Sequence, residues 1–282
     1  MMGDGDILCG MTMETAYQQS RYRVPQVEHG YGPRVHILDD PVAWTLLARA
    51  SAREVGMPQV ARLIRALYED LARRVLAAEL PREQMRVPSR MIGSHPEAVV
   101  HVEGIAHRTR VVTVGIARAG TMPSQVVFDL LNEVLEPSQV RQDHLFMSRE
   151  LNEQGEVVGA RWHDAKIGRD VQDRIILFPD PMGATGGSLC SAVAHYKAHL
   201  DGVPAKCIAM HLIITPEYLK RVQGEHPDLE VYALRLDRGL SPQEVLASKL
   251  GERWDDERGL NDHQYIVPGA GGVGEILNNA WI

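Results

Sequence analysis

One stretch near the middle of the chain constrains the fold most: an apolar run, an acid, a glycine-rich turn and a second apolar segment. Ile175–Phe178 is continuously apolar and lies between turn residues, which is typical of a strand covered on both faces. Prolines follow it and end the strand. Gly186 and Gly187 allow backbone conformations that are closed to other residues, and residues 189–200 then predict a helix. The order predicts a strand–turn–helix unit of an α/β fold.

The same stretch predicts a binding site for a phosphorylated sugar. Backbone N–H groups at a helix N-terminus form an anion site, and Thr185 and Ser188 add hydroxyl groups beside them. Asp180 follows the strand directly, at the carboxyl edge where open α/β sheets bind their ligands. The N–H groups suit a phosphate, and the carboxylate suits sugar hydroxyls.

Asp180–Ser188 reads Asp-Pro-Met-Gly-Ala-Thr-Gly-Gly-Ser and resembles the phosphoribosyl-pyrophosphate (PRPP) loop of type I phosphoribosyltransferases. The Asp-Pro-Met form, with Pro181 at a second acidic position, resembles the uracil branch. The resemblance implies a type I phosphoribosyltransferase-like α/β fold: a mostly parallel central sheet flanked by helices, with a small hood that binds the base. It also implies that Asp180 holds the ribose hydroxyls. The residues implied to cradle the 5-phosphate are Ala184, Thr185, Gly186, Gly187 and Ser188.

Two arginines are implied to receive pyrophosphate. Residues 110–116 predict a strand that ends at Ala117-Arg118-Ala119-Gly120, with a helix expected over 122–135. This segment resembles the family's pyrophosphate-contacting loop, which makes Arg118 a ligand; a structural salt bridge is the alternative, since an unpaired buried arginine is costly. Arg149 stands where the family has the cation of a Tyr-Arg pair, with Ser148 replacing the tyrosine.

The segment Tyr-Ile-Val-Pro-Gly-Ala-Gly at 265–271 resembles the uracil-binding segment of the family. The resemblance implies direct backbone contact with the polar edge of the base, for which glycines leave room. The family continues with Gly-Asp-Ala-Gly, and this chain lacks the acid; Glu275 lies nearby and is a candidate substitute. The residues implied to bind the base are Ile266, Gly271, Gly272 and Val273.

The resemblance therefore implies transfer of ribose 5-phosphate from PRPP to uracil, giving UMP and pyrophosphate in pyrimidine salvage. Mg²⁺ is the implied cofactor, and we expect a homodimer or a higher homo-oligomer. Gly272, Ser148 and Tyr218, the last in place of a family glycine, depart from the pattern. They keep two alternatives open: a transferase for another base, and a weakly catalytic regulator that binds PRPP or a nucleotide.

Bulk composition limits the partners. The formal net charge of -7 and a sequence pI of about 5.9 argue against nucleic-acid binding by overall charge. Three widely spaced cysteines fit a reducing cytosol, so we expect a cytoplasmic protein. The sequence has no run of about twenty apolar residues, so no membrane span is expected. It also lacks the basic-then-apolar order of a signal peptide.

We divide the chain into an N-terminal extension (1–34) and a phosphoribosyltransferase domain (35–282), with an insertion at about 241–260. The extension is either a mobile arm or packs on a partner subunit. The insertion predicts a surface element with one short helix, beside the active site or an interface. Asp39-Asp40-Pro41 predicts a helix start, with capping favoured over metal binding. Helices are expected from there to residue 55 and over 58–80.

Residues 81–96 predict a basic loop that carries Arg82, Arg86 and Arg90. This loop is either a solvated connection or a mobile lid whose arginines approach a polyphosphate. His195 and His199 have a spacing that can bind zinc, but surface histidines are favoured. Cys190 is interpreted as a small buried residue rather than an activated thiol. Further strands are expected over 98–102, 143–147, 206–214 and 229–236.

Overall fold

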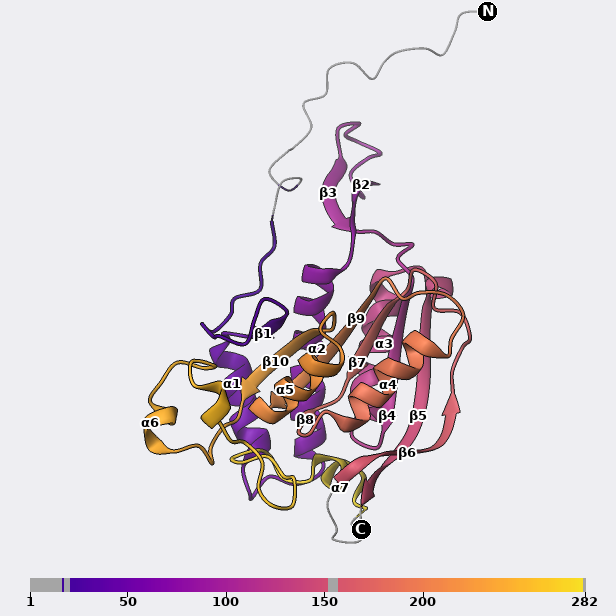
Figure 1. Ribbon diagram of the computed structural model, residues 1–282. Helices are drawn as coiled ribbons and strands as arrows, with labels where there is room; N and C mark the ends of the chain where they lie inside the picture. The colour runs from indigo at the N-terminus through magenta and orange to yellow at the C-terminus, as the bar shows by residue number, and fades with distance from the viewer. Residues whose placement is uncertain (1–16, 18–20, 152–156, 281–282) are drawn as a thin grey trace, which may run out of the picture.

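A mostly parallel eight-stranded sheet forms the centre of the molecule (Figure 1). The computed structural model describes residue 17 and residues 21–151 and 157–280, with the backbone alone over 148–151 and 157–162. The strand order is β1-β10-β9-β7-β4-β5-β6, with β8 also paired to β9. All pairs are parallel except β5 with β6. The strands are β1 (Val35–Ile37), β4 (Val111–Ala117), β5 (Val140–Leu151), β6 (Val157–Lys166), β7 (Ile175–Pro179), β8 (Met182–Gly183), β9 (Lys206–Ile214) and β10 (Glu230–Leu236).

Helices cover both faces of this sheet, which confirms the predicted architecture. Residues of α1, α2 and α3 share one apolar cluster with one face of the sheet, and residues of α4 and α5 share a second cluster with the other. The helices are α1 (Pro41–Ser51), α2 (Gln59–Glu79), α3 (Thr121–Val134), α4 (Gly187–Ala198), α5 (Pro216–Glu225), α6 (Gln243–Leu246) and α7 (Val273–Asn278), with short 3-10 turns η1 (Pro137–Gln139) and η2 (Trp254–Asp256).

Strand β7 shows why its sequence is apolar at every position. Its five residues are all buried. Ile175 and Leu177 belong to the cluster with α2 and α3, whereas Ile176 and Phe178 belong to the cluster with α4 and α5. Since successive side chains of a strand point to opposite faces, a strand between two helical layers needs apolar residues throughout.

The first helix begins as the sequence predicts. Asp40 caps α1, and its Oδ1 accepts hydrogen bonds from the backbone N–H groups of Val42 (2.9 Å) and Ala43 (3.0 Å). The acid therefore satisfies helix N–H groups that have no partner within the helix. The helix ends at Ser51, four residues earlier than expected. In α2, the predicted stripe from Val60 to Leu71 is buried against the sheet.

The prediction of a loop over 81–96 is wrong for residues 82–88 and correct for residues 89–96. Residues 82–88 form strand β2 (Arg82–Pro88), which pairs antiparallel with β3 (Val99–Ile105). In Figure 1 this hairpin extends from the end of the molecule opposite α7. Arg82 donates to the carbonyl of Ala77 and pairs with Glu103 at 3.6 Å. Figure 1 places the hairpin at the end of the molecule opposite α7, so its position within this chain does not favour the lid interpretation.

The predicted insertion packs on the segment that precedes β1. Gly30 donates its N–H to the carbonyl of Leu250 at 2.8 Å, and the rings of Tyr31 and Trp254 meet edge to face with centroids 5.1 Å apart. Glu257, fully buried, accepts from the Tyr31 hydroxyl and pairs with Arg238, each at 2.5 Å.

Residues 24–34 therefore pack within their own chain, which corrects the expectation of a free or partner-bound arm for this part. Residues 1–16 and 18–20 of the predicted extension lie outside the described residues. Within residues 21–151 and 157–280, no helix has the length and apolar character of a membrane span.

Candidate functional site

The loop after β7 brings a carboxylate next to a helix N-terminus. Asp180 follows the last residue of β7, and its backbone N–H donates to the carbonyl of Met210 on β9 at 3.1 Å. Its Oδ1 accepts from the backbone N–H of Met182 at 3.1 Å. The carboxylate is thus held against the start of the loop, at the carboxyl edge of the sheet, where the sequence places it.

The turn into α4 has the conformation that its glycines predict. Gly186 has φ = 78°, a left-handed conformation that favours glycine, and α4 begins at Gly187. In the described structure no side-chain hydrogen bond caps this helix from its N-cap residue. The N–H groups of the first turn of α4 have no partner one turn earlier in the helix, and that of Gly187 makes a long hydrogen bond of 3.5 Å to the Thr185 hydroxyl. An anion can bind to these donors, with Thr185 and Ser188 half-buried beside them.

A buried histidine–tyrosine pair supports this loop from beneath. His211 Nδ1 lies 2.6 Å from the carbonyl oxygen of Asp180, and its Nε2 lies 2.6 Å from the Tyr218 hydroxyl. A carbonyl oxygen only accepts, so Nδ1 carries the proton and Nε2 accepts from Tyr218. Burial lowers the pKa of His211 to about 4, which keeps the ring in this neutral form.

The Tyr218 ring also fills the space under the glycines of the loop. A Cβ atom added at Gly183 would lie 3.2 Å from the Tyr218 ring, and one at Gly186 would lie 3.5 Å from it. Thr215, at the N-cap of α5, donates its hydroxyl to the carbonyl of Ala184 at 2.7 Å. The residue that departs from the resembled corner, Tyr218, is therefore a structural support of the phosphate loop.

Arg118 lies at the carboxyl end of β4, the strand next to β7. The Ala117–Arg118 peptide is cis. The loop lies against the end of β7, since a Cβ added at Gly120 would lie 2.9 Å from the carbonyl oxygen of Pro179. Arg118 donates to the carbonyl of Ala280 at 2.7 Å and pairs with Glu275 at 3.4 Å.

The structure therefore gives Arg118 the salt bridge that the sequence left as an alternative, and it also leaves the side chain 35% exposed at the site. For Arg149 the structure describes only the backbone, which pairs with Ala160 in the β5–β6 ladder. Its expected contact with pyrophosphate stays a prediction.

In the segment predicted to bind the base, the backbone N–H and C=O of Ile266 point away from the neighbouring strand segment. Leu260 and Ile266 form an antiparallel bridge. The hydrogen bonds lie on either side of it: the N–H of Asn261 donates to the carbonyl of Tyr265 (3.0 Å), and the N–H of Val267 donates to the carbonyl of Gly259 (2.8 Å). In such a non-hydrogen-bonded pair, the N–H and C=O of each central residue point away from the partner. Ile266 can thus offer one donor and one acceptor to a ligand.

The side chains of Ile266 and Val273 cannot make that contact, because both are buried in the apolar core beside α2. Any contact from these predicted residues must come from the backbone. Gly269 and Gly271 have φ = 61° and φ = 70°, and Gly272 is the N-cap of α7. The glycines therefore set the path of the loop that the sequence predicts.

Two carboxylates that the sequence analysis did not single out hold this segment in place. Asp237, 3% exposed, accepts from the N–H of Gly269 at 2.7 Å and forms a two-pronged pair with Arg235 at 2.6 and 2.8 Å. Glu217 accepts from the N–H groups of Gly259 (2.9 Å) and Leu260 (3.3 Å). The signal available in the sequence was an acid directly after a predicted strand, as at Asp237, or in the first turn of a predicted helix, as at Glu217.

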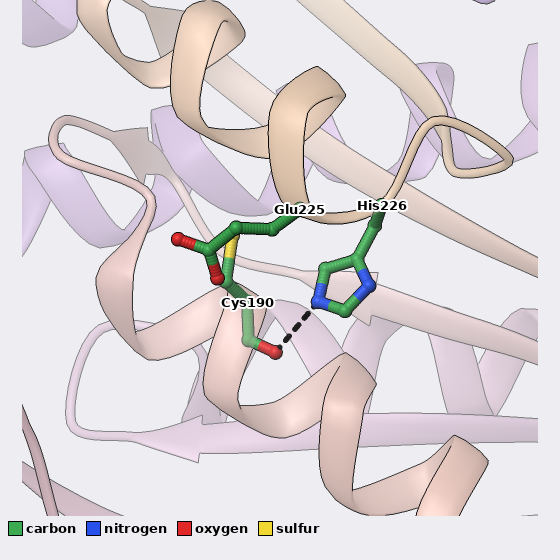
Figure 2. A group of neighbouring side chains, drawn as sticks. All are labelled: Cys190, Glu225 and His226. Atoms are coloured by element: carbon green, nitrogen blue, oxygen red, sulfur yellow. Dashed lines mark hydrogen bonds between the residues drawn. The ribbon is translucent and has the colours of Figure 1, made fainter.

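A group of possible metal ligands lies beside α4, apart from the phosphate loop. Figure 2 shows Cys190, Glu225 and His226, whose ligand atoms lie within 4.8 Å of one another. His226 Nε2 already donates to the carbonyl of Cys190 at 2.9 Å, so the nitrogen that faces the group carries a proton. Burial, and then Glu225, raise the pKa of the Cys190 thiol to about 12.

Both groups would have to lose protons before they could bind a cation. Cys190 is 1% exposed, which confirms the interpretation of a small buried residue. His195 is half-buried and His199 exposed, with ring centroids 5.2 Å apart. In the described part of the chain, neither belongs to a group of three possible metal ligands.

The comparisons with known proteins agree with this geometry. A sequence model of the family described as uracil phosphoribosyltransferase matches residues 37–256. A uracil phosphoribosyltransferase from an Exiguobacterium species is 40% identical over 113 residues, which are 40% of this chain and 43% of that protein. One from Acinetobacter baylyi is 36% identical over 123 residues, 43% of this chain and 47% of the relative. The chain thus matches less than half the length of these curated relatives.

A solved structure, that of the AQ2163 protein from Aquifex aeolicus, is similar with a TM-score of 0.64 and 21% identity, covering 86% of this chain and 97% of that one. It supports the fold alone. The sequence-family match includes the Asp180 loop and Arg118, and it extends over well more than half of the chain. The chain belongs to the uracil phosphoribosyltransferase family.

Proposed function

We propose that this protein transfers ribose 5-phosphate from PRPP to uracil and releases pyrophosphate, forming UMP in pyrimidine salvage. The observation that carries the proposal is the loop after β7, where the Asp180 carboxylate is followed by a left-handed turn at Gly186 and by the N-terminus of α4. A carboxylate suits sugar hydroxyls, and the N–H groups of a helix N-terminus suit a phosphate. The curated relatives are named for the same activity.

The reaction joins a ring nitrogen of uracil to the ribose C1 atom as the bond from C1 to pyrophosphate breaks. Pyrophosphate leaves with the bonding electrons, and the uracil nitrogen gives up its proton. Positive charge develops on the ribose, so the nearby Asp180 carboxylate stabilises that state, while Arg118 stabilises the departing anion. The loop from Ala184 to Ser188 fixes the 5-phosphate, and positioning supplies much of the rate. We assign no general base.

Magnesium fits this site through few protein groups. The Asp180 carboxylate offers oxygen atoms, whereas the phosphate loop offers N–H donors, which a cation does not bind. Mg²⁺ commonly binds one or two carboxylates together with substrate phosphates and waters. When bound, it would supply neutralisation of the charge that builds on pyrophosphate.

Gly272 favours a second candidate function, transfer to a base other than uracil. The outward N–H and C=O of Ile266 match one donor and one acceptor on a base edge, a pattern that several bases share. A weakly catalytic regulator that binds PRPP is the third candidate. We also propose a cytoplasmic location, in line with the sparse cysteines, and a homo-oligomer, as the family resemblance implies.

Incubation with Mg²⁺, PRPP and a panel of nucleobases tests these candidates. Uracil-dependent release of pyrophosphate, with UMP identified by mass spectrometry, is the expected result. Turnover with another base alone would replace uracil by that base. Calorimetric binding of PRPP without turnover would favour the regulator, and the absence of both binding and turnover would refute all three.

A further inference from the structure

We propose that Arg221 binds the 5-phosphate of PRPP from α5, next to the backbone N–H groups of the loop from Ala184 to Ser188. The inference rests on the proposed function and adds a side chain to its donor half. Local sequence does not single out this residue, because α5 follows the loop only after α4 and β9.

One face of α5 lies along the phosphate loop. In Figure 1, α5 lies beside α4 on the same face of the sheet. Its N-cap, Thr215, donates to the carbonyl of Ala184, and the ring of Tyr218, three residues later, lies next to Gly186. Arg221 follows after three more residues, and a spacing of three or four keeps side chains on one face of a helix. The face that supports the loop therefore brings Arg221 to the start of α4.

The missing side chain of Gly187 leaves room for the Arg221 guanidinium. A Cβ atom added at Gly187 would lie 3.1 Å from Nη1 and 3.6 Å from Cζ of Arg221. Gly187 is the first residue of α4 and does not have a positive φ, so its backbone conformation alone does not require glycine. Since Cβ atoms in a helix tilt toward its N-terminus, the guanidinium lies beside the first turn of α4.

Arg221 has N–H donors available for a ligand. Its Nε donates to Glu225, one turn later on α5, at 2.8 Å. No oxygen atom of the described residues accepts a hydrogen bond from its Nη1 or Nη2, and the side chain is 35% exposed. A guanidinium carries five N–H donors in a fixed fork that matches a phosphate. Both Nη groups can therefore donate to phosphate oxygens while Nε stays on Glu225.

The charge of a phosphate favours a cation at this place. A phosphate monoester carries about -1.5 to -2 at pH 7, whereas a helix N-terminus is equivalent to about +0.5. Figure 2 shows Glu225 beside Cys190 of α4, so the pair that it forms with Arg221 lies at this helix. Glu225 opposes the phosphate, but it is exposed and screened by water. The guanidinium adds a full positive charge to the partial charge of the N-terminus.

This role predicts a selective kinetic effect. The 5-phosphate keeps its charge while the bond from the ribose C1 atom to pyrophosphate breaks, so its contact with Arg221 is equally strong before and during that step. Loss of such a uniform contact raises KM and leaves kcat unchanged.

Calorimetry with ribose 5-phosphate tests the contact directly. Arg221→Gln should weaken binding by about 10- to 100-fold, the effect of losing a hydrogen bond to a charged group. Arg221→Lys keeps the charge and loses the fork, so it should bind more weakly than native and more tightly than Arg221→Gln. Arg253→Gln is the matched control, an exposed arginine that pairs with Asp256 nearby in sequence, and should bind within about 2-fold of native.

Steady-state kinetics separate binding from a general structural effect. Arg221→Gln should raise the KM for PRPP by a similar factor, with kcat and the KM for uracil within about 3-fold of native. Thermal unfolding shows that each variant folds, and Arg221→Lys alone decides if Arg221→Gln does not. The KM for PRPP decides if ribose 5-phosphate binds too weakly for calorimetry.

The outcomes separate this inference from the proposed function, which uracil turnover by the native protein tests. Unchanged binding and KM in Arg221→Gln, an equal loss in Arg253→Gln, or a lower kcat at unchanged KM refutes the role of Arg221 alone. Ribose 5-phosphate binding that depends on Arg221, without turnover, supports the contact and refutes the transfer. A native protein that neither binds ribose 5-phosphate nor turns over PRPP refutes both.

Discussion

The two halves of the site are built in different ways. The donor half, which surrounds Asp180 and the phosphate loop, rests on buried side chains of adjacent strands and helices, among them His211 and Tyr218. The acceptor half, residues 259–275, has little regular structure and is held by carboxylates that bind its backbone N–H groups. The matched family region, 37–256, contains the first half and ends before the second.

The difference teaches where this chain can vary without losing its fold. A change in the donor half must preserve the packing of a fully buried layer, because core substitutions that alter volume are costly. The acceptor half is held by its anchors, Asp237 and Glu217, and by the buried side chains of Ile266 and Val273, with glycines at its turns.

The largest expected effect is on the donor half. Asp180→Asn should lower the rate of pyrophosphate release by about 100- to 1,000-fold, because it removes a charge that stabilises the developing cation. Steady-state kinetics with saturating PRPP measure it. Asp255→Asn is the control, since that side chain is fully exposed. A rate within a few-fold of native for Asp180→Asn would contradict the assigned role.

Substitution of an anchor should affect the acceptor half selectively. Asp237→Asn weakens charge-assisted hydrogen bonds to Arg235 and Gly269, so the free energy of unfolding should fall by about 2 kcal/mol. The KM for uracil should rise while the affinity for PRPP stays unchanged. Asp256→Asn is the control, because it removes the charge of an exposed carboxylate that also pairs with an arginine, Arg253. Equal losses for both substrates would show that the halves are not separable.

Substitution of Tyr218 should affect the donor half selectively, so PRPP binding should weaken. Tyr218→Phe leaves Nε2 of His211 without its donor, which should destabilise the fold by about 1–2 kcal/mol and weaken PRPP binding through the displaced loop. Tyr196→Phe is the matched control, a buried hydroxyl that donates to Asp143 at 2.7 Å. Denaturant unfolding and calorimetry should show destabilisation in both variants and weaker PRPP binding only in Tyr218→Phe.

The free energy of unfolding should fall in mild acid because of His211, which supports the donor half. The pKa of His211 is lowered from 6.5 to about 4, so between these values the unfolded chain binds the proton and the folded chain does not. Stability therefore falls as the pH drops from 6.5 toward 4, with a slope of at most about 1.4 kcal/mol per pH unit from this group. Unfolding curves across that range should show a shallower slope in His211→Gln. An unchanged slope would contradict the assignment of this group.

Local pattern was enough to predict the backbone of the site. The apolar run of β7, the glycine at 186 and the acid at 180 predict a strand, a left-handed turn and a ligand edge, and the structure contains each of them. The same reasoning failed for residues 82–88, where arginines and a proline conceal a hairpin strand whose pairing with β3 satisfies its backbone. Strand formation there depends on a partner, which local composition does not specify.

The sequence by itself determined the strand–loop–helix units that contain β4 and β7, the carboxylate and glycines of the phosphate loop, and the family, because these features depend on residues close together in the chain. Only the tertiary structure decided that Tyr218 and His211 support the loop, that Asp237 anchors Gly269, and that Glu275 meets Arg118 across 157 positions of sequence. Such contacts depend on how whole elements pack, since side chains far apart in sequence become neighbours only when the sheet and its helices are assembled.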